Sequence, residues 1–417
     1  MISRRDFLQV AAAAAAVTGL GGRLGSVAAQ GAVRQDDLLR FSPKGQLTIL
    51  HMADSHAQLK PLYFREPSLN LGVGAARGQL PHLVGQEFMS SFGIAPSSLE
   101  AYMLTSGDFE ALAKTYGRVG GMDRIATLVN AIRGERGAER VLLLDGGDGL
   151  QGSFTALQTG GADMVAVMRA LGIEATTGHW EFTLGAQRVT ELFGSLTDKG
   201  SSGIPFLAGN VRDTDFQEPV FHSTRMFEKG GVSVAVIGQA FPYTPIANPR
   251  WMMPMWSFGI READLRHTVA AARQKGAGVV VLLSHNGFDV DRKLAARVEG
   301  IDVILTGHTH DALPEPMRVG DTLLVASGSH GKFLSRLDLE GEGGRVKDFA
   351  FALIPVLADV IAPDPAMARL IADIRAPHEA MLSTELARTE GLLYRRGTFS
   401  GSLDDLICEA MLTQRDA

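Results

Sequence analysis

Five short motifs place carboxylates and imidazoles along a chain of 417 residues. An Asp-x-His alone is as typical of a turn as of a metal site, and a Gly-Gly-Asp alone is more typical of a turn. Five such motifs in one chain indicate instead that their side chains bind metal ions. The motifs are Asp54-Ser55-His56, Gly146-Gly147-Asp148, Gly178-His179-Trp180-Glu181, Ser284-His285-Asn286-Gly287 and Gly307-His308-Thr309-His310.

The motifs supply enough ligands for two metal ions. Seven side chains suffice if one carboxylate is shared, and positions then remain open for water and substrate. Nitrogen and oxygen donors without thiolate suit Mn, Fe, Zn or Ni. Because a residue and its second neighbour project to the same side of an extended strand, the Asp-x-His motif and the His-x-His motif can each offer two ligands to one centre. The seven residues are Asp54, His56, Asp148, His179, His285, His308 and His310.

The remaining histidines are expected to be structural or exposed. Among them His330 stands out, because the glycine-rich loop around it follows a predicted strand. The set is His51, His82, His222, His267, His330 and His378.

Apolar, β-branched runs predict the strands that must position these motifs. Each run ends in glycine, serine or a charged or imidazole residue, and helix-like segments lie between several of them. This alternation is typical of a layered α/β domain, with its site at the strand ends. Helices are predicted over 123–133, 163–170 and 261–275. Strands are predicted over 47–52, 141–144, 232–237, 279–283, 301–305 and 323–325.

Composition excludes several classes of protein. The chain is 45% hydrophobic and 21% charged, so it is neither a disordered tail nor a coiled coil. A net charge of −6 gives no support to nucleic-acid binding. Cys408 is the only cysteine, so the sequence offers no internal disulfide and no cysteine-based metal site. Cys408 lies in a predicted helix with an apolar stripe, and we expect it to be buried.

Residues 1–29 have the pattern of a twin-arginine signal peptide. Arg4 and Arg5 precede an alanine-rich apolar stretch, and Val27-Ala28-Ala29 resembles a cleavage site. The alternative, an N-terminal helix of the mature fold, is less consistent with so short an apolar run. This pathway exports folded proteins, so we expect a periplasmic protein that is exported with its cofactor and has no membrane segment after cleavage.

Three further segments are predicted after the signal. Residues 30–362 are expected to form the catalytic domain, 363–390 a linking helix, and 391–417 the start of an incomplete C-terminal domain. The last segment contains a predicted turn at 397–401 and one helix, which is too little to fold alone.

The order of the motifs is similar to that of the calcineurin-like metallophosphoesterases, and especially of their exported 5′-nucleotidase branch. The third motif departs from that pattern. His179 stands where the family has an asparagine ligand, and Trp180 stands where nucleotidases have the histidine that protonates the leaving group. Thr183 stands where an aspartate partners that histidine.

These departures make the sequence resemble the SoxB thiosulfohydrolases of the periplasmic Sox sulfur-oxidation system. The same likeness is found at Tyr63–Pro67, in the three-proline loop 241–250, at 283–291 and at 393–397. It implies a four-layer αββα sandwich followed by the start of a 5′-nucleotidase-type C-terminal domain. It also implies two Mn²⁺ ions in preference to Zn²⁺, with a monomer expected. One ion would take Asp54, His56, Asp148 and His310, and the other Asp148, His179, His285 and His308.

The resemblance implies a hydrolase that releases sulfate from a thiosulfonate on a cysteine of the SoxYZ carrier protein, by means of a metal-bound hydroxide. Asp148, His179 and Trp180 are expected at the reacting centre. A sulfur leaving group has a pKa near ~8.5 and departs without a general acid, which Trp180 cannot supply. Two alternatives remain: a periplasmic 5′-nucleotidase-like phosphoesterase, or a catalytically silent subunit if the chain naturally ends at 417. The residues expected to bind the sulfonate are Arg65, Arg395 and Arg396.

Overall fold

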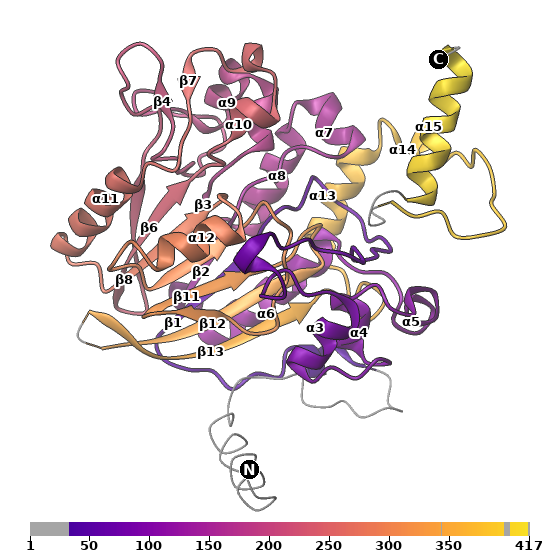
Figure 1. The fold of residues 1–417 in the computed structure, drawn as a ribbon, viewed down its shortest axis with the longest axis horizontal. Helices are drawn as coiled ribbons and strands as arrows, with labels where there is room; N and C mark the ends of the chain where they lie inside the picture. Colours follow the sequence, from indigo (N-terminus) through magenta and orange to yellow (C-terminus); the bar gives the residue numbers. More distant parts are fainter. Residues whose placement is uncertain (1–32, 343, 396–400, 416–417) are drawn as a thin grey trace, which may run out of the picture.

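The computed structural model describes residues 33–342, 344–395 and 401–415, in which two β-sheets are stacked between helices (Figure 1). The predicted signal peptide at 1–29, Arg396 and most of the predicted turn at 397–401 lie outside these residues. Within the described ranges, no helix combines the length and the apolar character needed to cross a membrane.

The first sheet has the strand order β13-β12-β1-β2-β3. β1, β2 and β3 run parallel, whereas β12 pairs antiparallel with both β1 and β13. Its strands are β1 (Leu47–Met52), β2 (Val141–Asp145), β3 (Ala175–Thr176), β12 (Phe333–Glu342) and β13 (Arg345–Pro355).

The second sheet has the order β10-β11-β9-β8-β6-β5, in which β6, β8, β9 and β11 are parallel. A separate small sheet pairs β4 (Arg212–Asp213) with β7 (Trp256–Ser257). The strands of the second sheet are β5 (Thr224–Lys229), β6 (Val232–Gln239), β8 (Val279–Ser284), β9 (Val303–Thr306), β10 (Met317–Val319) and β11 (Thr322–Ala326).

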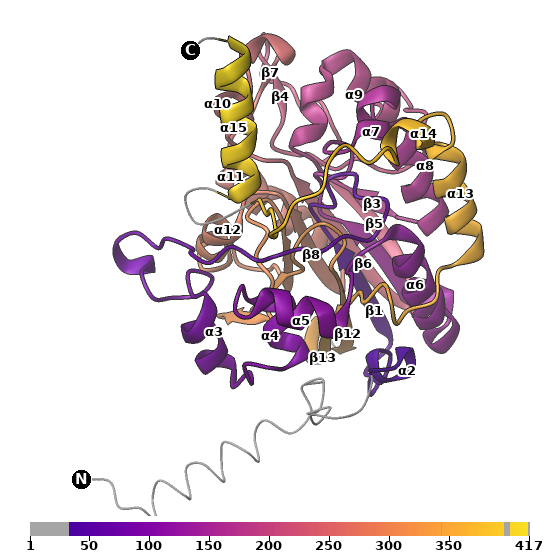
Figure 2. The same ribbon diagram turned by 90° about the vertical axis from the view of Figure 1, so that its right-hand side faces the viewer.

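Helices cover the outer face of each sheet. In Figure 2, α6, α8 and α13 lie together on one side, and α6 contacts β2. On the other side, α11 contacts β6 and β8, and α12 contacts β9 and β11. The helices are α2 (Gln35–Leu38), α3 (Gly85–Phe92), α4 (Leu99–Leu104), α5 (Phe109–Tyr116), α6 (Met122–Arg136), α7 (Phe154–Thr159), α8 (Ala162–Leu171), α9 (Ala186–Phe193), α10 (Thr244–Ala247), α11 (Glu262–Gln274), α12 (Phe288–Ala295), α13 (Pro365–Arg375), α14 (Glu379–Leu382) and α15 (Ser402–Arg415), with 3₁₀ turns at Gly74–Ala76, Ala138–Arg140, Trp180–Leu184 and Arg250–Met252.

Alternating side chains of β8 show how the layers are held together. Val279, Val281 and Leu283 belong to the core cluster that joins the two sheets. Val280 and Leu282 point the other way, into a cluster shared with α11 and α12. Both faces of the strand are therefore buried, which explains its continuous apolar sequence. The predicted four-layer sandwich is confirmed, while the predicted domain boundaries stay predictions.

Two expectations for the C-terminal part are wrong. The single helix predicted over 363–390 is interrupted, and α13 and α14 are separate helices. Pro377 follows α13, where it has no N–H to donate and its ring would clash with the preceding turn. Cys408 is exposed rather than buried, and none of the described residues of α15 is buried.

Candidate metal centre

The motif residues lie in the loops that leave the carboxyl ends of five parallel strands. β1, β2 and β3 of the first sheet lead to Asp54, Asp148 and His179. β8 and β9 of the second sheet lead to His285 and to the His-x-His motif. The strand ends of both sheets therefore meet at one edge of the sandwich, as ligand sites of α/β sheets do.

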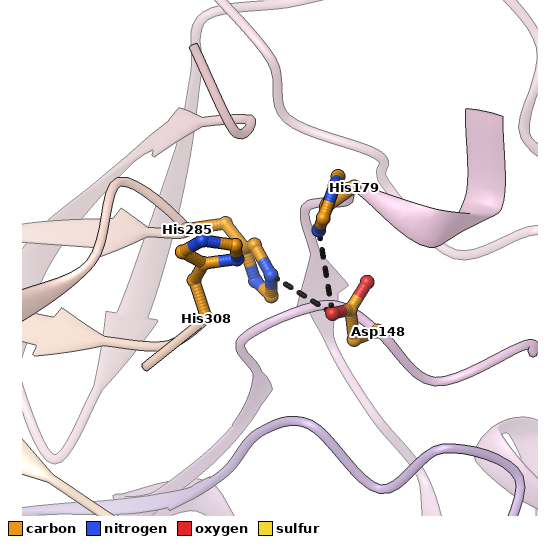
Figure 3. A group of neighbouring side chains, drawn as sticks. All are labelled: Asp148, His179, His285 and His308. Carbon is orange, nitrogen blue, oxygen red and sulfur yellow. Dashed lines mark ion pairs between the residues drawn. The ribbon is translucent and has the colours of Figure 1, made fainter. Parts of the chain in front are cut away.

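The structure brings the seven candidate ligands together in two groups. In the four-residue group, the potential ligand atoms all lie within 4.8 Å of one another (Figure 3). Asp54, His56 and His310 form a separate three-residue group by the same measure. The roles of these residues as metal ligands stay a prediction. The four-residue group consists of Asp148, His179, His285 and His308.

The two histidines of the His-x-His motif are divided between the groups in the way that the resemblance implies. His308 belongs to one group and His310 to the other. The backbone here is not the extended strand assumed for the motif, because φ is 78° at His308 and 60° at His310, so both residues are in the left-handed region. The rule that second neighbours share a side holds only for strands.

Asp148 faces both groups. Its Oδ1 accepts a hydrogen bond of 2.7 Å from the backbone N–H of Trp180. Its Oδ2 lies 3.2 Å from Nε2 of His285, 3.5 Å from Nδ1 of His179 and 3.9 Å from Nε2 of His56. One carboxylate oxygen is thus directed at histidines from both groups, as a ligand shared by two ions would be.

Buried polar atoms without partners show that these residues fit metal ions. Among the described residues, no hydrogen-bond partner is found for Oδ2 of Asp54, for Nε2 of His285 or for either ring nitrogen of His179. Burying such atoms unpaired is costly, and a bound cation would satisfy them. In the other group, the two Nε2 atoms of His56 and His310 face each other at 2.9 Å.

His285 is oriented by its second ring nitrogen. Nδ1 lies 2.6 Å from the carbonyl oxygen of Gly146, which can only accept, so Nδ1 carries a proton and donates it. Nε2 is thereby turned toward Asp148. A backbone carbonyl that fixes the tautomer of a histidine is common behind metal ligands.

The two aspartates at the centre have opposite pKa shifts. Burial raises the pKa of Asp54 well above its usual range, although the charge of His285 opposes this. Burial also acts to raise the pKa of Asp148, but His285 and His179 hold it well below its usual range. Burial lowers the pKa of His285, but Asp148 outweighs this effect and raises it to about 10. Binding of a cation here would therefore displace protons.

Glycines let the loops approach closely. At Gly147, where φ is 92°, an added Cβ would lie 3.0 Å from Nδ1 of His285 and 3.0 Å from Cα of Gly178. At Gly307 it would lie 3.2 Å from Oδ2 of Asp54. A side chain at either of these two positions would therefore crowd the candidate ligands.

Glu181 holds the loop of Asp148 in place. Its buried carboxylate accepts backbone N–H groups of Gly149 at 2.7 Å and of His179 at 2.9 Å, with longer contacts of 3.3 Å from Asp148 and Leu150. The side chain thereby joins two motifs through their backbones.

Aromatic side chains form the walls of the centre. The ring of Phe241 stacks on His308 with centroids 3.8 Å apart and lies 4.3 Å from the ring of His179. The indole of Trp180 is 5.1 Å from His179. Phe241 was not predicted from the sequence as a site residue, although its place just after β6, a strand parallel to β8, could have indicated it.

His330 lies beside the three-residue group. Its ring is 5.3 Å from that of His56 and 5.6 Å from that of His310, and its Nδ1 is 2.8 Å from Oγ of Ser329. The backbone N–H of His330 donates to the carbonyl oxygen of Asp54 at 2.8 Å. His330 was the one histidine outside the predicted ligands that stood out in the sequence, and its place beside the three-residue group is consistent with that.

The described arginines expected to bind substrate differ in their surroundings. Nη1 of Arg65 is buried and has no hydrogen-bond partner in the described part of the chain, and the guanidinium lies 4.8 Å from the ring centroid of Tyr394. Arg395 is largely exposed and donates to Asp404 at 2.8 Å. Arg65 therefore has an unused donor, whereas Arg395 is held by a carboxylate.

Known proteins resemble this chain in its N-terminal signal and in its fold. Residues 1–21 match the family model of the twin-arginine translocation (TAT) pathway signal sequence, which confirms the predicted export to the periplasm. The structure of the sulfate thiohydrolase SoxB from Thermus thermophilus, solved in complex with glycerol, aligns with a TM-score of 0.83 and 36% identity. The alignment covers 90% of this chain and 68% of that chain. The chain belongs to the SoxB family.

More distant relatives of this SoxB family member are 5′-nucleotidases. Those of Diplobatis ommata and Rattus norvegicus are each 26% identical, over 66% and 70% of this chain, and the aligned parts are 51% and 54% of those proteins. The chain thus spans about half the length of these relatives. A 5′-nucleotidase precursor from Thermus thermophilus shares the fold, with a TM-score of 0.67 at 22% identity over 88% of this chain and 67% of that one.

Proposed function

We propose that the chain is a metal-dependent thiosulfohydrolase that releases sulfate from a thiosulfonate on a cysteine of the SoxYZ carrier protein. Membership of the SoxB family supports the reaction class. The two groups of candidate ligands around Asp148 support a dinuclear centre.

The observation that carries this proposal over a phosphoesterase is the place of Trp180. Its indole packs against His179, at the position where the nucleotidase pattern has a proton-donating histidine. An indole donates no proton to a leaving alkoxide, and a general acid contributes about 10²–10⁴ in rate. A persulfide is a far better leaving group than an alkoxide, because sulfur acids have pKa values near ~8.5 or below. The site therefore suits a substrate cleaved at sulfur.

We assign the seven side chains to two Mn²⁺ ions, with Zn²⁺ or another divalent ion as the less favoured choice. Divalent ions bound there would lower the pKa of a water molecule and offset negative charge on the sulfonate oxygens. Asp148, which faces both groups, would serve both ions. His285, fixed by Gly146, would present Nε2 without needing to reorient.

The reaction balances without a redox partner. Water oxygen forms a bond to the terminal sulfonate sulfur, and the bond from that sulfur to the neighbouring sulfur breaks. The electron pair leaves with the carrier's sulfur as a persulfide anion, and sulfate and two protons are released. The unpaired Nη1 of Arg65 would donate to a sulfonate oxygen.

The test is sulfate release from a carrier whose cysteine has been loaded with thiosulfate. The unaltered chain is compared with His179→Ala, with a metal-stripped sample and with His267→Ala, an exposed histidine on α11. Release of phosphate from AMP is assayed in parallel.

We expect metal-dependent sulfate release from the unaltered chain and from His267→Ala, strong loss in His179→Ala, and no phosphate from AMP. Phosphate from AMP in place of sulfate would identify a 5′-nucleotidase. Silence with both substrates, in a sample shown to hold two metal ions, would favour a catalytically silent subunit and contradict the proposal.

A further inference from the structure

His82 links two loops that carry candidate metal ligands, although it belongs to neither. Its Nε2 lies 2.7 Å from Oδ2 of Asp289, on the first turn of α12, four residues after His285. Its Nδ1 lies 3.0 Å from Oδ1 of Asn70. The imidazole therefore connects the segment 70–82 to the loop of His285.

Asn70 continues the connection to the second loop. Its Nδ2 donates to the carbonyl of Pro81 at 3.0 Å and, at the longer distance of 3.5 Å, to Oδ1 of Asp311. Asp311 directly follows His310. The Pro81 carbonyl can only accept, so the amide of Asn70 is oriented with its oxygen toward His82.

Both ring nitrogens of His82 thus face acceptors. The amide oxygen of Asn70 accepts from Nδ1, and the carboxylate of Asp289 accepts from Nε2. The imidazole is largely enclosed, with 12% of its side chain exposed, so water replaces these partners poorly.

Thr309 adds a direct bridge between the same two loops. Its hydroxyl accepts from the backbone N–H of Phe288 at 3.2 Å and donates to Oδ2 of Asp311. Phe288 is buried in the cluster against which Leu80 and Leu83 pack. Polar and apolar contacts together therefore hold the segment around His82 against both loops.

We propose that His82 is a positioning residue of the metal centre, which holds the loop of His285 in place through Asp289, while Asn70 orients its ring. The inference rests on the metal site of the proposed function but not on its sulfur substrate. Groups that orient ligands commonly contribute about 10- to 100-fold in metal affinity. His82 acts through Asp289, so we expect an effect at the lower end of that range.

The experiment is titration of the metal-free full chain with Mn²⁺, measured by equilibrium dialysis and elemental analysis. Glutamine places a donor near the position of Nε2, and asparagine places one near Nδ1. His82→Gln therefore keeps the contact with Asp289, and His82→Asn keeps the contact with Asn70. His267→Ala is the control, and thermal unfolding of each metal-free variant reports folding.

We expect His82→Ala and His82→Asn to weaken Mn²⁺ binding about ten-fold, and His82→Gln to stay within about three-fold of the unaltered chain. Unchanged binding by a folded His82→Ala would overturn the proposal. If that variant does not fold, the other two decide: equal affinities of His82→Asn and His82→Gln would also overturn it. Failure of sulfate release with normal Mn²⁺ binding would count against the proposed function alone.

Discussion

The backbone N–H of Trp180 donates to Oδ1 of Asp148 at 2.7 Å, so the residue that cannot serve as a general acid also orients the carboxylate that faces both ligand groups. With Oδ1 held in this way, Oδ2 points at the histidines. This contact uses only the backbone of Trp180, so the identity of the side chain and the orientation of Asp148 can be tested separately.

Asp148→Asn should remove both metal ions, because the altered side chain is shared by the two groups. His310→Ala should affect mainly the three-residue group, leaving about one ion per chain. Elemental analysis after dialysis measures the stoichiometry. Retention of two ions by Asp148→Asn would show that this carboxylate is not shared.

Trp180→His combined with Thr183→Asp should introduce phosphatase activity. The two changes restore the proton donor and its partner, for which a gain of about 100-fold in AMP hydrolysis is expected. Release of phosphate at saturating AMP is the measurement, and Trp180→Phe is the matched control. If the double variant is no better than the control, absence of the acid does not explain the specificity.

Glu181→Gln should destabilise the fold, because an amide presents one acceptor oxygen where the carboxylate presents two. Loss of contacts to buried N–H groups such as that of His179 should lower the free energy of unfolding by about 1–3 kcal/mol. Urea denaturation measures this. The control Glu191→Gln, at an exposed position on α9, should change the free energy of unfolding little.

Acid should destabilise the protein through His51. Burial lowers the pKa of its imidazole to about 3, from an ordinary value of 6.5. The unfolded chain therefore binds this proton at higher pH than the folded chain, and stability is lost as the pH falls below about 6.5. At pH 5 the loss is about 2 kcal/mol.

His51→Asn removes this titration, so its unfolding free energy should fall less between pH 7 and pH 5 than that of the unaltered protein. Both proteins share all other titrating groups, which cancel in the comparison. If the unfolding free energies of the two proteins fall equally between pH 7 and pH 5, His51 is not a buried, neutral imidazole in the folded protein.

Arg65→Ala should raise the KM for the loaded carrier about ten-fold, with a smaller rise for Arg65→Lys, because lysine keeps the charge but not the planar fork. Steady-state sulfate release measures both. Arg388, an exposed arginine paired with Glu385, supplies the control Arg388→Ala. An unchanged KM in Arg65→Ala would remove Arg65 from the substrate site.

The central strands and the motif residues were predictable because their signals are local. β1 and β8 are continuous apolar runs, and the glycines of the motifs mark the loops that follow strands. The separation of His308 from His310 was implied by the family resemblance but not by spacing, since it depends on left-handed backbone in the loop. The roles of Asn70 and His82 depend on contacts with residues more than 200 positions away in the sequence. No sequence pattern near either residue indicates these contacts.

The exposure of Cys408 has a similar cause. An apolar stripe predicts that a helix has an apolar face. It does not predict that other described residues of the chain pack against that face. Pro377, by contrast, is a local signal that predicts a break in the helix at this position.

Each ligand group takes side chains from both sheets: Asp148 and His179 follow strands of the first, and His285 and His308 follow strands of the second. Ions held in this way would cross-link the two halves of the sandwich, much as a disulfide joins distant segments. The printed chain has a single cysteine and cannot form an internal disulfide. For a protein exported already folded, metal loading would then add to the coupling that the shared apolar core already provides between the two sheets outside the cytoplasm.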